Sequence, residues 1–240
     1  MAIQIESAML LAAGLGKRLQ PLTLTTPKPL LPLDGELLID HQLRYLRAAG
    51  IKRVAINLYH LGQLIRDHAG SGAEYGLEIF YSEEATLLGT GGGIKNAARF
   101  FGRSPFVALN ADALIMADIK NLVRRHTESG AEATIAVKKL SSEDDYTPIS
   151  ISEDGAVRAF GEGDHFFTGL SILGPEIFDA LPAAGQEACL IKDGFKQLMA
   201  RKGKLNSMAY EGYFNDLGTP ERYEQAKRDI AEGKFKLLID

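Results

Sequence analysis

Short apolar segments alternate with segments of helical spacing over the first 140 residues, and this alternation constrains the fold most. Runs of apolar and β-branched residues predict buried strands at 8–12, 53–58, 77–81, 106–110 and 133–138. Between them the apolar spacing predicts helices at 36–49, 61–69, 94–101 and 119–129. Strands that alternate with helices form parallel sheets, because each parallel connection must cross over the sheet. The sequence therefore predicts an α/β fold with a Rossmann-like, mostly parallel sheet that carries helices on both faces.

The pattern changes in the second half of the chain. Residues 148–160 alternate around a Glu-Asp-Gly turn, which is typical of a hairpin. Further elements are expected as a strand at 167–173, a short helix from Pro175, a helix at 191–201, a strand at 205–210 and a last helix from Thr219. Neither a linker nor a repeat interrupts the chain. We expect one domain over 1–240, with halves of about 1–140 and about 141–240 and a small mixed β lobe in the second.

Composition narrows the class of protein. The 240 residues are 45% hydrophobic, which is ample for one core, and the formal net charge is −4 without a basic stripe. We therefore expect no nucleic-acid partner and an anionic ligand only in a local pocket. No apolar run approaches the roughly 20 residues that span a bilayer, and no basic residue precedes the first apolar run, so we expect neither a membrane partner nor a signal peptide. The single cysteine, Cys189, fits a cytoplasmic location.

A glycine-containing loop follows the first predicted strand directly. Gly14 and Gly16 allow a sharp turn and a close approach of the backbone to a ligand, and successive N–H groups in such a turn can hold an anion. Arg18 adds a fork of donors that suits phosphate oxygens. Lys28 lies ten residues further on, between two prolines that stiffen the backbone. This segment is typical of a phosphate site.

Other interpretations of this loop stay open on the residues alone. A tight turn with solvated basic side chains would look the same. In a dinucleotide-binding fold a third glycine would stand at Leu19, and an acidic residue would end the second strand, where Asn57 and Leu58 stand. The G-K-[ST] of a P-loop is also missing.

Two aspartates sit where they could serve a metal ion. Asp112 comes two residues after the strand 106–110, and a side chain at the carboxyl end of a parallel strand projects into the ligand crevice. Asp216 lies just before the last helix. Carboxylates from two distant positions can share one Mg²⁺ with substrate phosphates. Each aspartate alone could equally be an ordinary turn residue.

Three segments together resemble the sugar-phosphate nucleotidyltransferase family. Residues 10–43, LLAAGLGKRLQPLTLTTPKPLLPLDGELLIDHQL, resemble its N-terminal signature L-A-A-G-x-G-x-R followed by P-K-P. Residues 214–219, FNDLGT, are similar to its [FW]-x-D-x-G-T segment, and the stretch from Glu83 to Gly92 is similar to its E-x-x-x-L-G-T-[AG]-G loop. The resemblance covers nearly the whole chain and is nearest to short bacterial members.

The resemblance implies roles for individual residues. Gly14, Gly16 and Arg18 would hold the departing β- and γ-phosphates, and Lys28 would lie near the α-phosphate. Arg18, Lys28 and Asp112 would be the catalytic residues, while Asp112 and Asp216 would hold Mg²⁺ as the cofactor. The implied nucleotide-binding set is Leu11, Ala12, Ala13, Gly14, Gly16, Lys17, Gly91, Gly92 and Asn110.

The sugar side is less like the family. An E-K-P often follows the hairpin in the family, whereas Gly161-Glu162-Gly163 stands here. Glu162 is still the expected sugar contact, together with Thr168 and Gly169 in the following strand and Lys192. Ala111 replaces a frequent family glycine, which affects the backbone next to Asp112 and not the carboxylate itself.

The function that the resemblance implies is transfer of a nucleoside monophosphate from an NTP to a sugar 1-phosphate, with release of pyrophosphate. The first half would bind the nucleotide and the second the sugar. UTP with N-acetylmuramate 1-phosphate is favoured. The alternatives are GTP with mannose or heptose 1-phosphate, CTP with phosphocholine, and a non-catalytic protein that senses a nucleotide-sugar. A dinucleotide-binding oxidoreductase is the weakest alternative.

Overall fold

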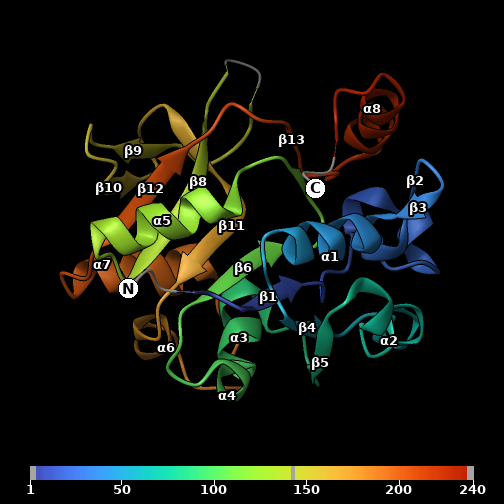
Figure 1. The fold of residues 1–240 in the computed structure, drawn as a ribbon, viewed down its shortest axis with the longest axis horizontal. Coiled ribbons are helices and arrows are strands. Elements are labelled where there is room, and N and C mark those ends of the chain that lie inside the picture. The colour runs from blue at the N-terminus through green and yellow to red at the C-terminus, as the bar shows by residue number, and fades with distance from the viewer. Residues whose placement is uncertain (1–3, 142–143, 237–240) are drawn as a thin grey trace.

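The computed structural model describes residues 4–141 and 144–236 and gathers nine of their strands into one sheet (Figure 1). The strand order is β10-β9-β11-β6-β1-β4-β5, and β8 pairs with both β11 and β12. The strands are β1 (Ser7–Leu11), β4 (Arg53–Leu58), β5 (Glu78–Glu83), β6 (Phe106–Asn110), β8 (Ala133–Lys139), β9 (Ile149–Ile151), β10 (Val157–Phe160), β11 (His165–Leu173) and β12 (Leu205–Ala209). Two small ribbons pair β2 (Pro32–Leu33) with β3 (Glu36–Leu37), and β7 (Leu114–Ile115) with β13 (Phe214–Asn215).

Helices cover both faces of this sheet. They are α1 (Leu38–Ala48), α2 (Gly62–Ala69), α3 (Gly89–Asn96), α4 (Ala98–Phe101), α5 (Ile119–Ser129), α6 (Glu176–Ala180), α7 (Lys196–Ala200) and α8 (Pro220–Ala231). Short 3₁₀ turns lie at Lys17–Leu19, Leu22–Leu24, Lys28–Leu30 and Ala73–Tyr75, and a π-helical turn at Leu190–Phe195 leads into α7. None of the helices in the described residues is long and apolar enough to cross a membrane.

The central strands are buried on both sides, as the apolar runs predict. In β1, Ala8 and Leu10 pack into a core cluster with α1, α2 and α5, whereas Met9 packs into a second cluster with α3, α4 and α6. The pairs β1–β4, β1–β6 and β4–β5 are parallel. The predicted α/β fold with a mostly parallel sheet is therefore confirmed.

The second half extends the same sheet. Strand β11 is antiparallel to both β6 and β8, and the predicted hairpin is present as β9 and β10. The pairing of β11 with β8 shifts register between Phe167 and Ser171. Within this bulge the hydroxyl of Thr168 donates to the carbonyl oxygen of Ala136 at 3.0 Å. The hydroxyl of Thr168 thus bonds a carbonyl that lacks a backbone donor because the bulge interrupts the hydrogen bonds between the strands.

Three predicted helices differ in the structure. Helix α1 begins two residues late because Glu36–Leu37 pairs as β3. The expectation that helix 94–101 starts after the glycine run is wrong, because Gly89 is already the first residue of α3 and a separate helix, α4, begins at Ala98. The first half of the predicted helix 191–201 is a π-helical turn.

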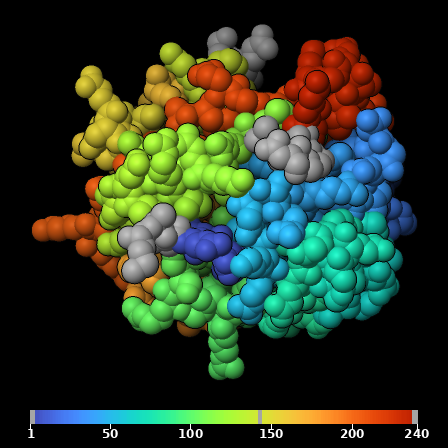
Figure 2. Space-filling view, in the orientation of Figure 1, coloured from blue at the N-terminus to red at the C-terminus, as the bar shows by residue number. Residues whose placement is uncertain are grey.

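A third core cluster ties the C-terminal helix to the N-terminal segment. Tyr223 and Ala226 of α8 pack with Leu19, Leu31 and Leu33. The space-filling view shows the red C-terminal segment directly against the blue region of β2 and β3 (Figure 2). The segment that precedes α8 is thereby held close to the glycine-containing loop.

Candidate active site

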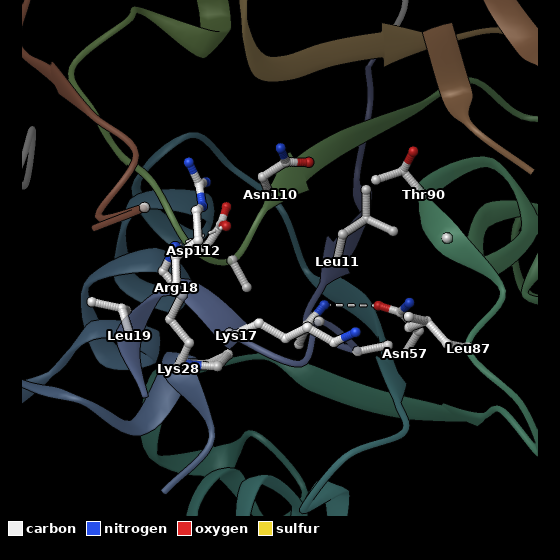
Figure 3. Close-up of a pocket in the computed structure, with 18 residues that line it drawn as sticks. Leu11, Lys17, Arg18, Leu19, Lys28, Asn57, Leu87, Thr90, Asn110 and Asp112 are labelled. Carbon is white, nitrogen blue, oxygen red and sulfur yellow. Dashed lines mark hydrogen bonds and ion pairs between the residues drawn. The ribbon is translucent and has the colours of Figure 1, made fainter. Parts of the chain in front are cut away.

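A cavity of about 370 Å³ opens at the carboxyl ends of β1, β4 and β6 (Figure 3). Leu11, the last residue of β1, is in register with Asn57 near the end of β4 and with Asn110 at the end of β6. The chain leaves β1 toward β4 on one side and returns later to β6 on the other. Ligands of open α/β sheets bind at such a reversal of strand order.

Most of the predicted nucleotide and catalytic residues line this cavity. They are Leu11, Ala12, Ala13, Gly14, Gly16, Lys17, Arg18, Lys28, Asn110 and Asp112. The cavity is also lined by Leu19, Pro29, Asn57, Leu87, Gly89, Thr90, Ala111 and Gly218. Residues from six separate stretches of the chain thus converge on one cavity.

The glycine-containing loop has a fixed turn. Gly16 has φ +59°, and the hydroxyl of Thr23 donates to its carbonyl oxygen at 2.8 Å. The 3₁₀ turn that follows buries Leu19 in the third core cluster. Lys17 and Arg18 precede this anchor and stay exposed to the cavity. The loop therefore presents cationic side chains from a backbone that the core fixes.

Lys28 is a buried cation at the floor of the cavity. Its side chain is 8% exposed, and Nζ lies 2.9 Å from Oδ2 of Asp112. The same ammonium group donates to the backbone carbonyl oxygen of Asp216, also at 2.9 Å. A 3₁₀ turn with buried Pro29 holds this lysine. Lys28 thereby brings together the two stretches that carry the predicted metal-binding aspartates.

Asp216 is held by a second basic side chain. Nη1 of Arg222 lies within 3.1 Å of both carboxylate oxygens of Asp216, and the N–H of Gly218 donates to Oδ1 at 3.0 Å. Arg18 comes close as well, because a Cβ added to Gly218 would lie 2.6 Å from its Nη2. The carboxylate of Asp216 therefore sits among cationic groups and an amide.

Of the two predicted metal-binding aspartates, Asp112 has the side chain that suits a magnesium ion bound together with substrate phosphates. The side chain of Asp112 is 44% exposed, and Lys28 bonds only one of its oxygens. No cluster of three or more His, Cys, Asp or Glu residues is present within 4–141 and 144–236. Mg²⁺ typically takes one or two carboxylates and completes its shell with phosphates and water. Asp112 keeps one carboxylate oxygen for such an ion, whereas Arg222 contacts both oxygens of Asp216, and the assignment of the two aspartates to Mg²⁺ stays a prediction.

The opposite wall of the cavity includes Leu87 and Thr90 (Figure 3), and Gly89, next to Thr90 in the chain, also lines the cavity. Behind it, the carboxylate of Glu84 is buried and bonded to Asn57. Burial raises the pKa of the Glu84 carboxyl above its usual value, although hydrogen bonds from Asn57 and Leu88 oppose the rise. No sequence motif predicted a site role for Asn57. Its position near the end of the strand 53–58 was the available signal.

Some predicted residues lie away from the cavity lining. Gly91 and Gly92 are buried in α3 and pack against the segment 186–190. A side chain at either position would clash with that segment. The hydroxyl of Thr168 bonds inside the sheet. Gly169, with φ +87°, packs against the side chain of Asn110 and so lies beside the cavity.

Glu162 and Lys192 are exposed residues outside the cavity lining. Glu162 belongs to the turn after β10, and Lys192 belongs to the π-helical turn. The assignment of Glu162, Thr168, Gly169 and Lys192 to sugar binding stays a prediction, and so does that of Gly91 and Gly92 to nucleotide binding.

The chain resembles proteins of known activity along most of its length. It is 36% identical to an N-acetylmuramate alpha-1-phosphate uridylyltransferase of Neisseria meningitidis over 227 residues, which cover 92% of this chain and 96% of that protein. It is 30% identical to a D-glycero-alpha-D-manno-heptose 1-phosphate guanylyltransferase of Aneurinibacillus thermoaerophilus, with 93% and 97% covered. A UTP–glucose-1-phosphate uridylyltransferase of Synechocystis is 32% identical over 95% of this chain, which spans 64% of that longer relative.

The fold is also that of solved structures. HddC from Yersinia pseudotuberculosis, solved in complex with GMP-PN, matches with a TM-score of 0.80 at 24% identity and covers 94% of this chain and 100% of its own. The sequence model of the family described as nucleotidyl transferase matches residues 7–233. The chain therefore belongs to the sugar-phosphate nucleotidyltransferase family.

Proposed function

We propose that this protein transfers a nucleoside monophosphate from an NTP to a sugar 1-phosphate and releases pyrophosphate. One observation carries the proposal. The glycine-containing loop, Lys28 and Asp112 all meet in one cavity at the reversal of strand order. This combination offers backbone N–H groups, a buried ammonium group and a free carboxylate oxygen, which together suit a triphosphate with a divalent cation.

The reaction needs alignment of anions more than proton transfer. A phosphate oxygen of the sugar 1-phosphate would form a bond to the α-phosphorus, while the bond from that phosphorus to the β-phosphate oxygen breaks. A phosphomonoester has its second pKa at about 6, so the attacking oxygen is already ionised near neutral pH. The protein must therefore offset charge repulsion and hold the reactants in line. We assign no general base.

Each cationic group would act on a different phosphate. Lys28 lies deepest and would offset the charge that develops on the α-phosphate. Arg18 and the N–H groups near Gly14 and Gly16 would hold the β- and γ-phosphates as they leave. Asp112 and Asp216 would hold Mg²⁺, which supplies charge neutralisation across the phosphates when bound.

The two halves of the chain would divide the substrates. We propose that residues up to about 140 bind the nucleotide and that those from about 141 bind the sugar. Support comes from the bulge in β11, which places Gly169 against Asn110 at the rim of the cavity. Backbone groups at that bulge are the favoured contacts for the sugar, with Glu162 and Lys192 as further candidates.

UTP and N-acetylmuramate 1-phosphate are the favoured substrates. Support comes from the Neisseria relative, which is 36% identical and matched over 96% of its length. GTP with heptose or mannose 1-phosphate is the second candidate, because the Aneurinibacillus relative is covered equally well at 30% identity. The base would meet mainly backbone atoms of Leu11 to Ala13 and of Gly89, so side-chain identities there give little information about which base is bound.

Pyrophosphate release tests the proposal. UTP, GTP, CTP and dTTP would each be combined with N-acetylmuramate, mannose, heptose and glucose 1-phosphates and with phosphocholine, with Mg²⁺ or with EDTA. We expect Mg²⁺-dependent release from UTP with N-acetylmuramate 1-phosphate. Asp112→Asn should reduce this turnover strongly while the protein stays folded. Release from no pair would contradict the proposed activity, and retained Mg²⁺-dependent turnover in Asp112→Asn would remove Asp112 from the metal site.

A further inference from the structure

A row of hydrogen bonds connects the two walls of the nucleotide cavity. The backbone N–H of Ala12, in the first wall, donates to Oδ1 of Asn57 at 2.8 Å (Figure 3). Nδ2 of Asn57 donates to Oε1 of Glu84 at 2.7 Å. The backbone N–H of Leu88, next to the opposite wall, donates to Oε2 of Glu84 at 2.9 Å. The loop after β1 and the start of α3 are thus joined through two side chains.

These two side chains are enclosed. Asn57 is 2% exposed and Glu84 is 7% exposed. Gly93 of α3 packs directly on them, because a Cβ added there would lie 2.6 Å from Nδ2 of Asn57 and 2.8 Å from Oε1 of Glu84. Neither side chain can therefore move toward α3 unless the helix shifts. The bonds fix the walls in relation to one another.

The direction of every bond in the row is determined. The N–H groups of Ala12 and Leu88 can only donate. Asn57 must consequently point its oxygen at Ala12 and its NH₂ group at Glu84, and Glu84 must accept on both oxygens. A buried carboxylate is costly unless it is fully bonded. Apolar residues could fill the same space without this cost. The row of hydrogen bonds is therefore better suited to orienting the two cavity walls than to stabilising the fold.

We propose that Asn57 and Glu84 are positioning residues that set the separation of the cavity walls and thereby the affinity and base selectivity for the NTP. This inference rests on the proposed function only in placing a nucleotide in the cavity. Glu84 acts through Asn57 and Leu88 and does not contact the ligand. The base would lie between the backbone of Leu11 to Ala13 and that of Leu87 to Thr90, so a change in either wall alters how well it fits.

Because each group in the row has a fixed role as donor or acceptor, exchanging these roles tests the inference. In Asn57→Asp two carboxylates would face each other, and in Glu84→Gln an NH₂ group would face a donor. Glu84→Gln therefore leaves one buried donor unpaired, and in Asn57→Asp the two buried carboxylates repel each other until one takes up a proton. In the double variant Asn57→Asp/Glu84→Gln the new carboxylate accepts from Ala12 and from the new amide, and the amide oxygen accepts from Leu88. All three bonds are restored with their roles exchanged.

Calorimetric binding of UTP and GTP, together with KM and kcat, measures the outcome. We expect each single variant to weaken UTP binding and raise its KM by roughly tenfold or more, and the double variant to return both to within about threefold of the wild type. The value of kcat should change less than KM, because the groups proposed to act on the phosphates are untouched. The UTP-to-GTP preference should shift in the single variants and recover in the double variant.

Thr134→Val is the matched control. Thr134 is fully buried in β8 and bonded to His126 at 3.0 Å, away from the cavity. Thr134→Val should lower the thermal unfolding midpoint of the protein without changing its affinity for UTP. Single variants that bind UTP like the wild type, or a double variant that binds no better than the singles, would overturn the inference. A wild type that binds UTP without turnover would contradict the proposed activity and leave the affinity comparison valid.

Discussion

The guanidinium group of Arg222 holds the carboxylate of Asp216, with Nη1 at 3.1 Å from Oδ1 and 3.0 Å from Oδ2. The same arginine donates through Nη2 to Oδ1 of Asp145 at 2.7 Å and lies over the ring of Tyr146 at 4.9 Å. Arg222 belongs to α8, which packs on the N-terminal segment. A helix outside the sheet thus sets the orientation of a carboxylate that we propose as a metal ligand.

Replacing Arg222 should therefore reduce turnover. Arg222→Met removes both bonds to Asp216, and misplacement of a metal ligand by about 1 Å can cost roughly a hundredfold in rate. We expect kcat/KM to fall by at least about tenfold across all Mg²⁺ concentrations. Asp145→Asn is the matched control, because it breaks only the exposed side of the cluster and exposed ion pairs contribute little. Equal activity of the two variants would contradict the positioning role.

The two loop glycines should respond differently to alanine. A Cβ added to Gly14 would meet no protein atom within 4 Å, and the backbone there is not in the left-handed region. At Gly16 the φ of +59° and a Cβ 2.7 Å from Cγ2 of Thr23 both oppose a side chain. Gly14→Ala should leave the free energy of unfolding within about 0.5 kcal/mol and weaken UTP binding. Gly16→Ala should lower the free energy of unfolding by about 1 kcal/mol or more.

Urea unfolding and UTP titration of the same two proteins give both quantities. The contrast separates a glycine required for ligand approach from one required for the turn. If Gly14→Ala binds UTP as tightly as the wild type, then the backbone at Gly14 does not approach the nucleotide closely.

The parallel core could be predicted from the sequence because it depends on local patterns. A strand buried on both faces needs a continuous apolar run, and 8–12, 53–58 and 106–110 have one. Packing between distant segments is not local, and the differences lie there. The glycines of α3 were expected before the helix, yet Gly91 and Gly92 are helical, and neighbouring chain at 186–190 occupies the space that their side chains would need.

In the candidate site, too, local motifs could be predicted from the sequence and contacts between distant segments could not. Residues in contiguous motifs, such as Gly14, Arg18 and Lys28, could be predicted, and the structure places them in one cavity. The role of Asn57 depends on partners 27 and 45 residues away, and that of Arg222 depends on how α8 packs against the N-terminal segment. No spacing within the sequence gives these contacts.

Replacing Lys28 tests whether its positive charge acts on the α-phosphate. Lys28→Met keeps the length of the side chain and removes its charge, so Asp112 and the carbonyl of Asp216 lose their shared donor. We expect kcat to fall by roughly a hundredfold or more, because charge stabilisation in a transition state is typically of this size. Lys28→Arg should not rescue it, since the planar fork does not fit a buried point contact. Turnover within tenfold of the wild type in Lys28→Met would place the α-phosphate elsewhere.

Far from the cavity, Asp40 should make part of the stability depend on acid pH. Burial by itself raises the pKa of the Asp40 carboxyl, but hydrogen bonds from Tyr75 at 2.5 Å, from His68 at 2.7 Å and from the N–H of Leu37 outweigh it and hold the pKa below its usual value. The folded protein then binds fewer protons here than the unfolded chain. The stabilisation is therefore present above the unfolded pKa of about 3.9 and is lost as the pH falls through the folded value.

Asp40→Asn should consequently flatten the acid side of the stability profile. Urea unfolding between pH 6 and pH 3 would show a smaller drop in the free energy of unfolding than in the wild type, along with a lower value at pH 6. Asp67→Asn, at an exposed position on α2 where the carboxylate accepts from Gln63, controls for loss of one negative charge. Because Asp40 joins α1 to α2 and to the turn at Ala73–Tyr75, a profile in Asp40→Asn as steep as that of the wild type would show that these contacts do not depend on its charge.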